Sequence, residues 1–182
     1  MRIIIARDYG EMSRKAAHIL AGQLIMKPES VIGLATGSTP LGTYEHLVAM
    51  YRDGLLSFGR ATTFNLDEYC GLAEDDPQSY RYFMEMNLFR HVDMKKENIH
   101  IPSGISNDLK KECSEYEERI RRSGGIDFQL LGIGRNGHIG FNEPDLKFES
   151  GTHVVELDED TRDANARFFR HMEDVPREAI SM

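Results

Sequence analysis

The sequence has few of the features that mark secreted or membrane proteins. Its 182 residues include two cysteines, Cys70 and Cys113, and no tryptophan. Two cysteines do not make a disulfide framework, and their spacing matches no metal-binding motif. The apolar run at residues 3–6 is too short for a signal peptide, and no later segment is long enough to span a bilayer. We therefore expect a cytoplasmic protein with no membrane partner and no metal site.

Positive charge is also in short supply. The 22 basic and 30 acidic residues give a net charge of −8, which argues against nucleic acid or an anionic membrane as the main partner. The sequence shows no linker rich in proline, glycine or serine, no low-complexity run and no internal repeat. Residues 1–182 are therefore expected to form a single domain.

Short, branched apolar segments alternate with segments of helical periodicity. The expected strands are residues 3–6, 31–35, 62–66, 99–101, 126–131 and 154–157. The expected helices are residues 9–26, 41–56, 79–89, 108–122 and 161–169. Nearly continuous apolar strands are typical of parallel sheets that are covered on both faces. The alternation predicts an α/β fold, a doubly wound, mostly parallel sheet with helices on both faces, in which ligands bind at the carboxyl ends of the strands.

Polar groups are concentrated in the glycine-rich segment Gly132–Pro144, directly after the expected strand 126–131. His138 can exchange a proton near neutral pH, and Asn136 and Glu143 are close enough in sequence to fix its tautomer and tune its basicity. The segment therefore predicts an acid–base centre. A plain turn in which the histidine only caps a neighbouring element is the alternative.

The same segment contains the Gly-x-Gly-x-x-Gly spacing of dinucleotide-binding proteins, which ends at Gly137, and Glu156 lies about where the ribose-binding acid would be. That motif requires its last glycine to open a long helix. Gly140, Pro144 and Gly151 interrupt the segment instead, which disfavours a nucleotide site.

A second cluster of polar residues, Thr36-Gly37-Ser38-Thr39, follows the strand 31–35 and precedes Pro40 and a helix. Thr39 is expected to cap that helix, and Pro40 fits its first turn. Hydroxyls and backbone N–H groups at a helix N-terminus suit a phosphate, although the lysine of a P-loop is missing. A capped turn without a ligand is the alternative.

A third cluster, Asp67-Glu68, follows the strand 62–66. We expect one of these acids to face the crevice, where it could act as a general base, and the other to face solvent. Acids that are merely solvated in a loop are the alternative. Three polar strand ends in one sheet favour a common site.

Taken together, these residues resemble the glucosamine-6-phosphate deaminase (glucosamine-6-phosphate isomerase) family. The resemblance covers the whole chain and rests on four motifs in order, namely Gly33–Pro40, Phe64–Tyr69, Gly132–Pro144 and Thr161–Phe169. The third motif is the most specific, because the related 6-phosphogluconolactonases share a Gly-His turn but lack its Phe-Asn-Glu-Pro continuation.

The resemblance implies a Rossmann-like, sugar-phosphate isomerase fold and a hydrolase of amino-sugar catabolism. Such an enzyme converts D-glucosamine 6-phosphate and water to D-fructose 6-phosphate and ammonia, without a cofactor or metal. Asp67 corresponds to the base that moves a proton between C2 and C1 of the open sugar. His138 corresponds to the ring-opening residue, with Asn136 and Glu143 as its supports.

The phosphate of the sugar falls, on the same resemblance, to Thr36, Gly37, Ser38, Thr39 and Arg167. A guanidinium suits that anion because it can donate two hydrogen bonds at once. The substrate would then be held in register while a carboxylate removes a carbon-bound proton.

The chain also departs from the family. Some relatives have Asp in place of Asn136, so here the charge beside His138 would come from Glu143. Family members continue beyond residue 182 with further strands, helices and a phosphate-site lysine, and residues 179–182 resemble the start of a strand. We therefore expect a single domain that lacks the family's C-terminal part.

Two further predictions concern the oligomeric state and the alternative functions. The segment Lys147–His153 is not a convincing regulatory anion site, which favours an unregulated monomer or small homo-oligomer. The competing hypotheses are a sugar-phosphate-binding module without catalysis, which some related folds form, and a truncated inactive form. No DNA-reading helix pair is present to support a regulator, and the expected catalytic groups are all in place.

Overall fold

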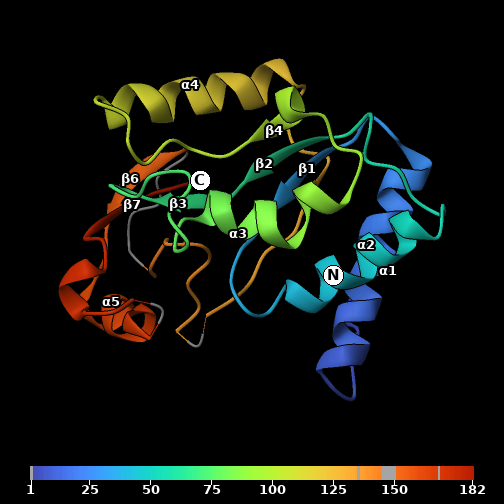
Figure 1. Ribbon diagram of the computed structural model, residues 1–182, viewed down its shortest axis with the longest axis horizontal. Helices are drawn as coiled ribbons and strands as arrows, with labels where there is room; N and C mark the ends of the chain where they lie inside the picture. Colours follow the sequence, from blue (N-terminus) through green and yellow to red (C-terminus); the bar gives the residue numbers. More distant parts are fainter. Residues whose placement is uncertain (1, 135, 145–150, 168) are drawn as a thin grey trace.

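Helices and strands alternate along the chain (Figure 1). The computed structural model describes residues 2–134, 136–144, 151–167 and 169–182. The helices are α1 (Tyr9–Met26), α2 (Leu41–Arg52), α3 (Tyr80–Asn87), α4 (Leu109–Arg122) and α5 (Glu159–Ala166). The strands are β1 (Val31–Leu34), β2 (Thr62–Asn65), β3 (Asp67–Tyr69), β4 (Ile99–His100), β5 (Phe128–Gln129), β6 (His153–Glu156) and β7 (Glu178–Ser181). Short 3₁₀ turns cover Phe89–His91, Lys96–Asn98 and Met172–Asp174.

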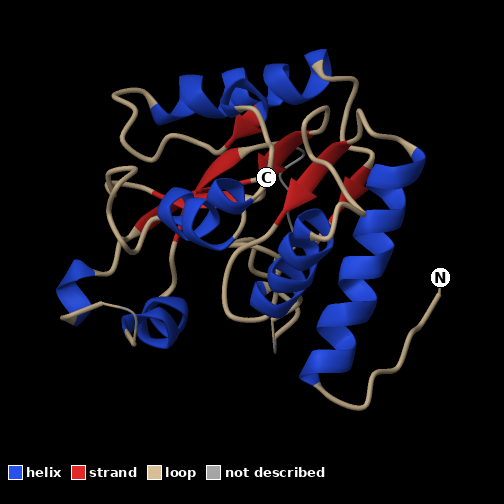
Figure 2. Cartoon of the chain, turned by 45° about the vertical axis from the view of Figure 1, so that its right-hand side comes forward, coloured by secondary structure: helices blue, strands red, loops and turns tan. Residues whose placement is uncertain are grey.

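The larger sheet is parallel, with the strand order β4-β2-β1-β5. Ile32 and Leu34 of β1 belong to the main core, to which α1, α2 and α3 contribute. Val31 points to the opposite face, where it packs with Phe64 and with Tyr116 of α4. Figure 2 shows this sheet between its helices. The predicted α/β fold with helices on both faces is therefore confirmed.

The N-terminal ends of α1 and α4 explain why these helices begin where they do. Asp8 accepts a hydrogen bond from the backbone N–H of Glu11 at 2.7 Å, and Asp108 accepts one from that of Lys111 at 2.9 Å. Each carboxylate satisfies an N–H group that has no partner within its helix. The expected helices 9–26 and 108–122 agree with α1 and α4 to within one residue.

A second, smaller sheet is antiparallel, with the order β3-β7-β6. The expected strand 154–157 forms as β6, but it pairs antiparallel with β7 instead of joining the parallel sheet. A run of branched apolar residues predicts a strand without indicating its partner or direction, which is why the sequence did not reveal this sheet.

The chain passes from one sheet to the other at Leu66. Its N–H donates to the carbonyl of Leu34 in the parallel sheet at 2.9 Å, and its carbonyl accepts from the N–H of Met182, just after β7, at 2.9 Å. Leu66 is buried. The residue that follows, Asp67, is therefore fixed at the seam between the two sheets.

The expected strand at residues 3–6 does not form. Ile3 and Ile5 are 74% and 84% exposed, and none of the strand pairs in the described part of the chain includes this segment. Branched residues favour an extended backbone, but a strand also needs a neighbour to bond with. The expected strand 126–131 likewise shortens to β5, which pairs with β1 along one edge.

None of the described helices is both long and apolar enough to cross a bilayer.

Tyr116 provides a test of how α4 is held on the sheet. Its ring meets Phe64 edge-on at 5.5 Å, and its hydroxyl donates to the carbonyls of Asn65 and His100 at 2.8 and 3.2 Å. Tyr116→Phe keeps the ring contacts and removes both hydrogen bonds at a fully buried position. We expect the free energy of unfolding in urea to fall by about 1–2 kcal/mol.

Tyr51→Phe is the matched control, because the Tyr51 hydroxyl makes no hydrogen bond among the described residues. It should leave the unfolding midpoint unchanged. Equal stability of the two variants would show that the Tyr116 hydroxyl does not anchor α4.

Candidate active site

Asp67 lies at the start of β3, where it is paired with Ser181 of β7 and only 5% exposed. Its Oδ1 atom is buried and has no hydrogen-bond partner among the described residues. Burial raises the pKa of Asp67 to about 8, and the neighbouring carboxylate of Glu68 adds to this rise. A carboxylate that is costly to ionise binds a proton firmly, as a general base must.

Gly140 brings the glycine-rich turn up to Asp67. A Cβ atom at this position would lie 3.0 Å from Asp67 Oδ2 and 3.0 Å from Ser181 Oγ, and the backbone has φ = +62°. Glycine is required both for this conformation and for the close approach. The turn that contains His138 is therefore packed against the carboxylate of Asp67.

The turn itself contains no helix in its described residues, 130–134 and 136–144. Ile139 and Asn142 exchange backbone hydrogen bonds in an isolated antiparallel bridge. Gly137 has φ = +93°. The segment thus lacks the helix that a dinucleotide site would need, in agreement with the sequence.

Asn136, His138 and Glu143 come together inside this turn. Asn136 Nδ2 donates to Glu143 Oε2 at 2.5 Å, and the backbone N–H of His138 donates to Asn136 Oδ1 at 3.2 Å. Glu143 Oε1 lies 3.8 Å from His138 Nδ1 and also accepts from Thr161 Oγ1 of α5 at 2.7 Å. Glu143 is thus held by two donors while one of its oxygens faces the imidazole.

Room for the imidazole depends on Gly134. A Cβ atom at this position would lie 2.2–2.5 Å from three ring atoms of His138. The backbone N–H of Gly134 also donates to the carbonyl of His138 at 2.9 Å. Any side chain at residue 134 would therefore displace the ring.

The loop Thr36–Thr39 leads from β1 into α2. The hydroxyl of Tyr9 in α1 donates to the carbonyls of Ser38 and Thr39 at 3.0 and 3.1 Å and accepts from the N–H of Gly42 at 2.9 Å. The expected capping by Thr39 is wrong, since Pro40 is at the N-cap and no side chain of the loop caps α2. Instead, the hydroxyl of Tyr9 in α1 accepts a hydrogen bond from the backbone N–H of Gly42 in the first turn of α2.

The remaining expected phosphate ligand is Arg167, which follows α5 as its C-cap and has an exposed side chain. Gly37, Ser38 and Thr39 are exposed as well, whereas Thr36 is half-buried and hydrogen-bonded to Tyr80 of α3. Their joint action on a phosphate stays a prediction. Residues 147–150 of the expected regulatory stretch lie outside the described residues.

Glu68 corrects a prediction. It was expected to face solvent if Asp67 faced the crevice, but it is 3% exposed. Its carboxylate accepts from the backbone N–H groups of Tyr69, Tyr80 and Arg81, each at 2.9 Å. Glu68 is shielded from solvent because the start of α3 packs over β3 and covers this side chain.

Thr161 and Asn65 were also missed. Thr161 belongs to a motif noted in the sequence, yet nothing there connected it to Glu143. The side chain of Asn65 is fully buried, with neither its oxygen nor its nitrogen bonded among the described residues. The clue in the sequence was an amide within an apolar strand, two residues before Asp67. A buried amide is normally hydrogen-bonded, so an unpaired one indicates a site that binds a polar group.

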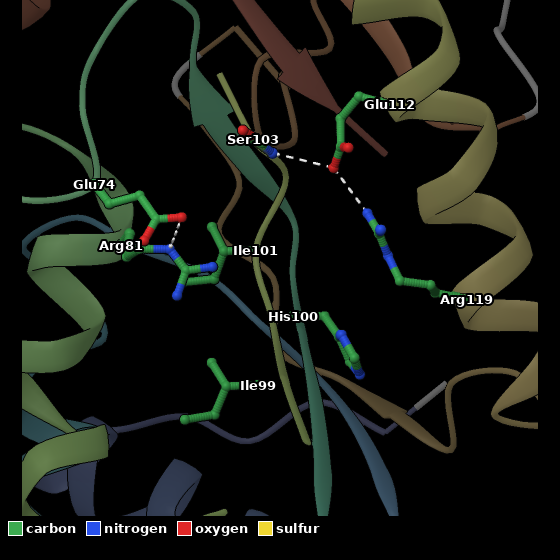
Figure 3. A pocket seen from close by; sticks show the side chains of 8 residues that line it. All are labelled: Glu74, Arg81, Ile99, His100, Ile101, Ser103, Glu112 and Arg119. Atoms are coloured by element: carbon green, nitrogen blue, oxygen red, sulfur yellow. Dashed lines mark hydrogen bonds and ion pairs between the residues drawn. The ribbon is translucent and has the colours of Figure 1, made fainter. Parts of the chain in front are cut away.

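Two hollows open elsewhere on the surface, and neither is lined by Asp67, His138 or Glu143. One, of about 220 Å³, lies along β4, and its charged walls include Arg81, Glu112 and Arg119 (Figure 3). The other, of about 460 Å³, is lined by Leu72, Asp76, Pro77, Gln78, Phe169, Arg170 and Asp174. Among the described residues, no three His, Cys, Asp or Glu side chains are grouped to hold a metal ion.

The sequence of this chain matches a known protein family. Residues 9–167 match the family model for glucosamine-6-phosphate isomerases/6-phosphogluconolactonase. The chain belongs to this family. Within it, glucosamine-6-phosphate deaminases from Thermoanaerobacter sp. (strain X514) and Clostridioides difficile (strain 630) are 59% and 56% identical over the whole chain, which covers 72% and 73% of their lengths.

Solved structures of the glucosamine-6-phosphate isomerase/6-phosphogluconolactonase family are similar to the structure of this chain. A monomeric glucosamine-6-phosphate deaminase superposes with a TM-score of 0.97 at 49% identity, over 100% of this chain and 76% of that one. A 6-phosphogluconolactonase from Thermotoga maritima reaches 0.71 at 20% identity, over 99% and 75%, and shows a shared fold. The predicted family is therefore confirmed, whereas the predicted domain boundaries stay a prediction.

The burial of Asp67 predicts a pH-dependent contribution to stability. Because its pKa rises from 3.8 to about 8 on folding, the folded state retains a proton that the unfolded state loses between these values. Its contribution to stability is therefore complete below about pH 4 and is lost as the pH rises to about 8. Asp67→Asn, which stays neutral, should gain stability relative to the original chain from pH 5 to pH 8. Urea denaturation at several pH values measures this difference, and a constant difference would contradict the raised pKa.

Proposed function

We propose that this protein converts D-glucosamine 6-phosphate and water to D-fructose 6-phosphate and ammonia, as the names of its 54–59% identical relatives suggest. The observation that carries the proposal is the buried, partly unpaired carboxylate of Asp67 next to the turn that holds His138 and Glu143. A base and an acid–base pair that lie side by side suit a sugar that must be opened and then enolised.

Ring opening is the first step, and we assign it to His138. The bond between C1 and the ring oxygen breaks, the ring oxygen gains a proton, and the C1 hydroxyl loses one. The carboxylate of Glu143 faces Nδ1 of His138 at 3.8 Å, where it can orient the imidazole for proton transfer. Asn136 and Thr161 fix the orientation of that carboxylate.

Proton transfer between carbons is the second step, and we assign it to Asp67. The carboxylate removes the proton from C2 of the open sugar while the C1 oxygen takes up a proton from solvent, and the proton held by Asp67 is then delivered to C1. Water adds to the resulting iminium carbon at C2, a proton passes from this water to nitrogen, and the C2–N bond breaks to leave a C2 carbonyl and ammonia. The high pKa of Asp67 is an advantage here, since a carbon acid requires a strong base.

The phosphate is assigned to the loop Thr36–Thr39 together with Arg167. Tyr9 holds two carbonyls of the loop, and Tyr80 holds Thr36, so the loop is ordered before a ligand binds. Hydroxyls, backbone N–H groups and a guanidinium complement a phosphate. The monomeric relative supports a monomer in solution, and a cytoplasmic location stays a prediction.

Asp67→Asn tests the function directly. We expect ammonia release from glucosamine 6-phosphate to fall by about 10³-fold or more, because an amide cannot accept the proton from carbon. Substrate binding should persist, since the phosphate contacts are untouched. The exchange of solvent deuterium into the sugar measures the proton transfer itself, and wild-type exchange in the variant would assign the base to another group. Binding of the substrate by the unaltered chain without ammonia release would point to a binding module.

Glu143→Gln tests the role of the turn. Removing this charge should slow the turnover of the cyclic substrate, because the carboxylate that faces Nδ1 of His138 is lost. The pH–rate profile, compared between the cyclic sugar and an analogue that cannot close its ring, measures this effect. Thr161→Val is the matched control, because it removes one hydrogen bond to Glu143 and leaves the charge in place. Superimposable profiles for Glu143→Gln and the original chain would end the assignment.

A further inference from the structure

Glu68 is a buried carboxylate that the proposed steps do not use. It directly follows Asp67, pairs with Ile180 of β7 and is 3% exposed. Burial raises its pKa, but the backbone N–H groups of Tyr80, Arg81 and Tyr69 and the charge of Arg81 oppose that rise. These groups stabilise the ionised carboxylate. Burying a second negative charge next to a buried base destabilises the folded chain unless other groups compensate that charge.

The compensation comes mainly from the N-terminus of α3. Ser79 accepts from the N–H of Tyr82 at 3.0 Å, and Glu68 accepts from the N–H groups of the first two helical residues, Tyr80 and Arg81. N–H groups without partners and the positive end of the helix dipole both favour an anion there. Through these hydrogen bonds, Glu68 links the N-terminus of α3 to β3, the strand that contains Asp67.

The guanidinium of Arg81 does not form an ion pair with Glu68 within the described part of the chain. It turns away to Glu74, with Arg81 Nε 3.3 Å from Glu74 Oε1 (Figure 3). The negative charge of Glu68 is thus balanced by backbone dipoles and by a cation that is shared with another acid. Its field extends to Asp67, since dipoles screen a charge less completely than a directly paired ion.

The tyrosines whose pKa values the charge of Asp67 raises do not offset this field. These are Tyr44 of α2, Tyr80 of α3, Tyr116 of α4 and Tyr69 of β3, and because burial raises their pKa values further, these phenols are neutral at physiological pH. From β7, Ser181 faces Asp67 with a neutral hydroxyl. Glu68 is the charged group that acts on Asp67 most strongly.

We propose that Glu68 is a positioning residue that holds α3 against β3 and whose fixed negative charge strengthens Asp67 as a base. The proposal rests on the proposed function for its catalytic meaning, although the electrostatic effect on Asp67 is measurable without substrate. It also assigns Glu68 a role different from that of a substitute base, because its oxygens are occupied by three N–H groups.

Two substitutions separate charge from anchoring. Glu68→Gln removes the charge and retains an oxygen that can accept from the helix, whereas Glu68→Asp retains the charge on a shorter side chain. Glu74→Gln is the matched control, since it removes an exposed carboxylate that contacts Arg81. Carboxyl carbon NMR titration reads the pKa of Asp67, whose resonance is identified by its loss in Asp67→Asn.

For Glu68→Gln, we expect the titration midpoint of Asp67 to move to lower pH by about one unit. Glu68→Asp and Glu74→Gln should keep the midpoint within about 0.3 unit of the original chain. Glu68→Asp should lower the melting temperature by loosening α3. An unchanged midpoint in Glu68→Gln, or an equal shift in Glu68→Asp, would overturn the proposal. If Glu68→Gln does not fold, Glu68→Asp decides, because a downward shift there would show that charge is not the cause.

The pH–rate profile of ammonia release distinguishes this inference from the proposed function. We expect the acidic limb of Glu68→Gln to move in the same direction as the NMR midpoint, with a several-fold lower plateau. A profile that overlays that of the original chain would overturn the inference and leave the function standing. If the original chain releases no ammonia from glucosamine 6-phosphate, the function fails, and the NMR titration still decides the role of Glu68.

Discussion

The burial of two adjacent carboxylates at the seam between the sheets is the constraint around which the rest of the structure is arranged. Leu66 is hydrogen-bonded to both sheets, so the residues after it cannot turn toward solvent. Glu68 is compensated by the first turn of α3, whereas Asp67 keeps one oxygen unpaired. An uncompensated polar group of this kind destabilises the folded chain, and such groups are concentrated at functional sites.

The neighbouring elements can be understood from the same seam. Gly140 allows the glycine-rich turn to approach Asp67, and Phe141 of that turn packs with Tyr69 and Tyr80 in the smaller core. Tyr80 carries this contact on to Thr36 through its hydroxyl. An aromatic cluster thus joins the three polar strand ends.

The sequence predicted the parts that depend on local pattern. The range of α1, the parallel sheet and the grouping of Asn136, His138 and Glu143 all follow from periodicity, capping residues or closeness in sequence. The antiparallel sheet, the helix-capping role of Glu68 and the bond from Thr161 to Glu143 depend on residues 12 to 114 positions apart. Such pairings are set by the packing of the whole chain, and no local pattern predicts them.

The hydrogen bond from Thr161 has a consequence for measurement. Glu143 Oε1 is shared between the hydroxyl of Thr161 on α5 and the imidazole of His138. A displacement of α5 would free that oxygen to approach the ring, which would change the environment of the imidazole protons. The chemical shift of the imidazole protons therefore reports the position of a helix that holds no part of the ring, and a spectroscopist could follow α5 by observing a single histidine.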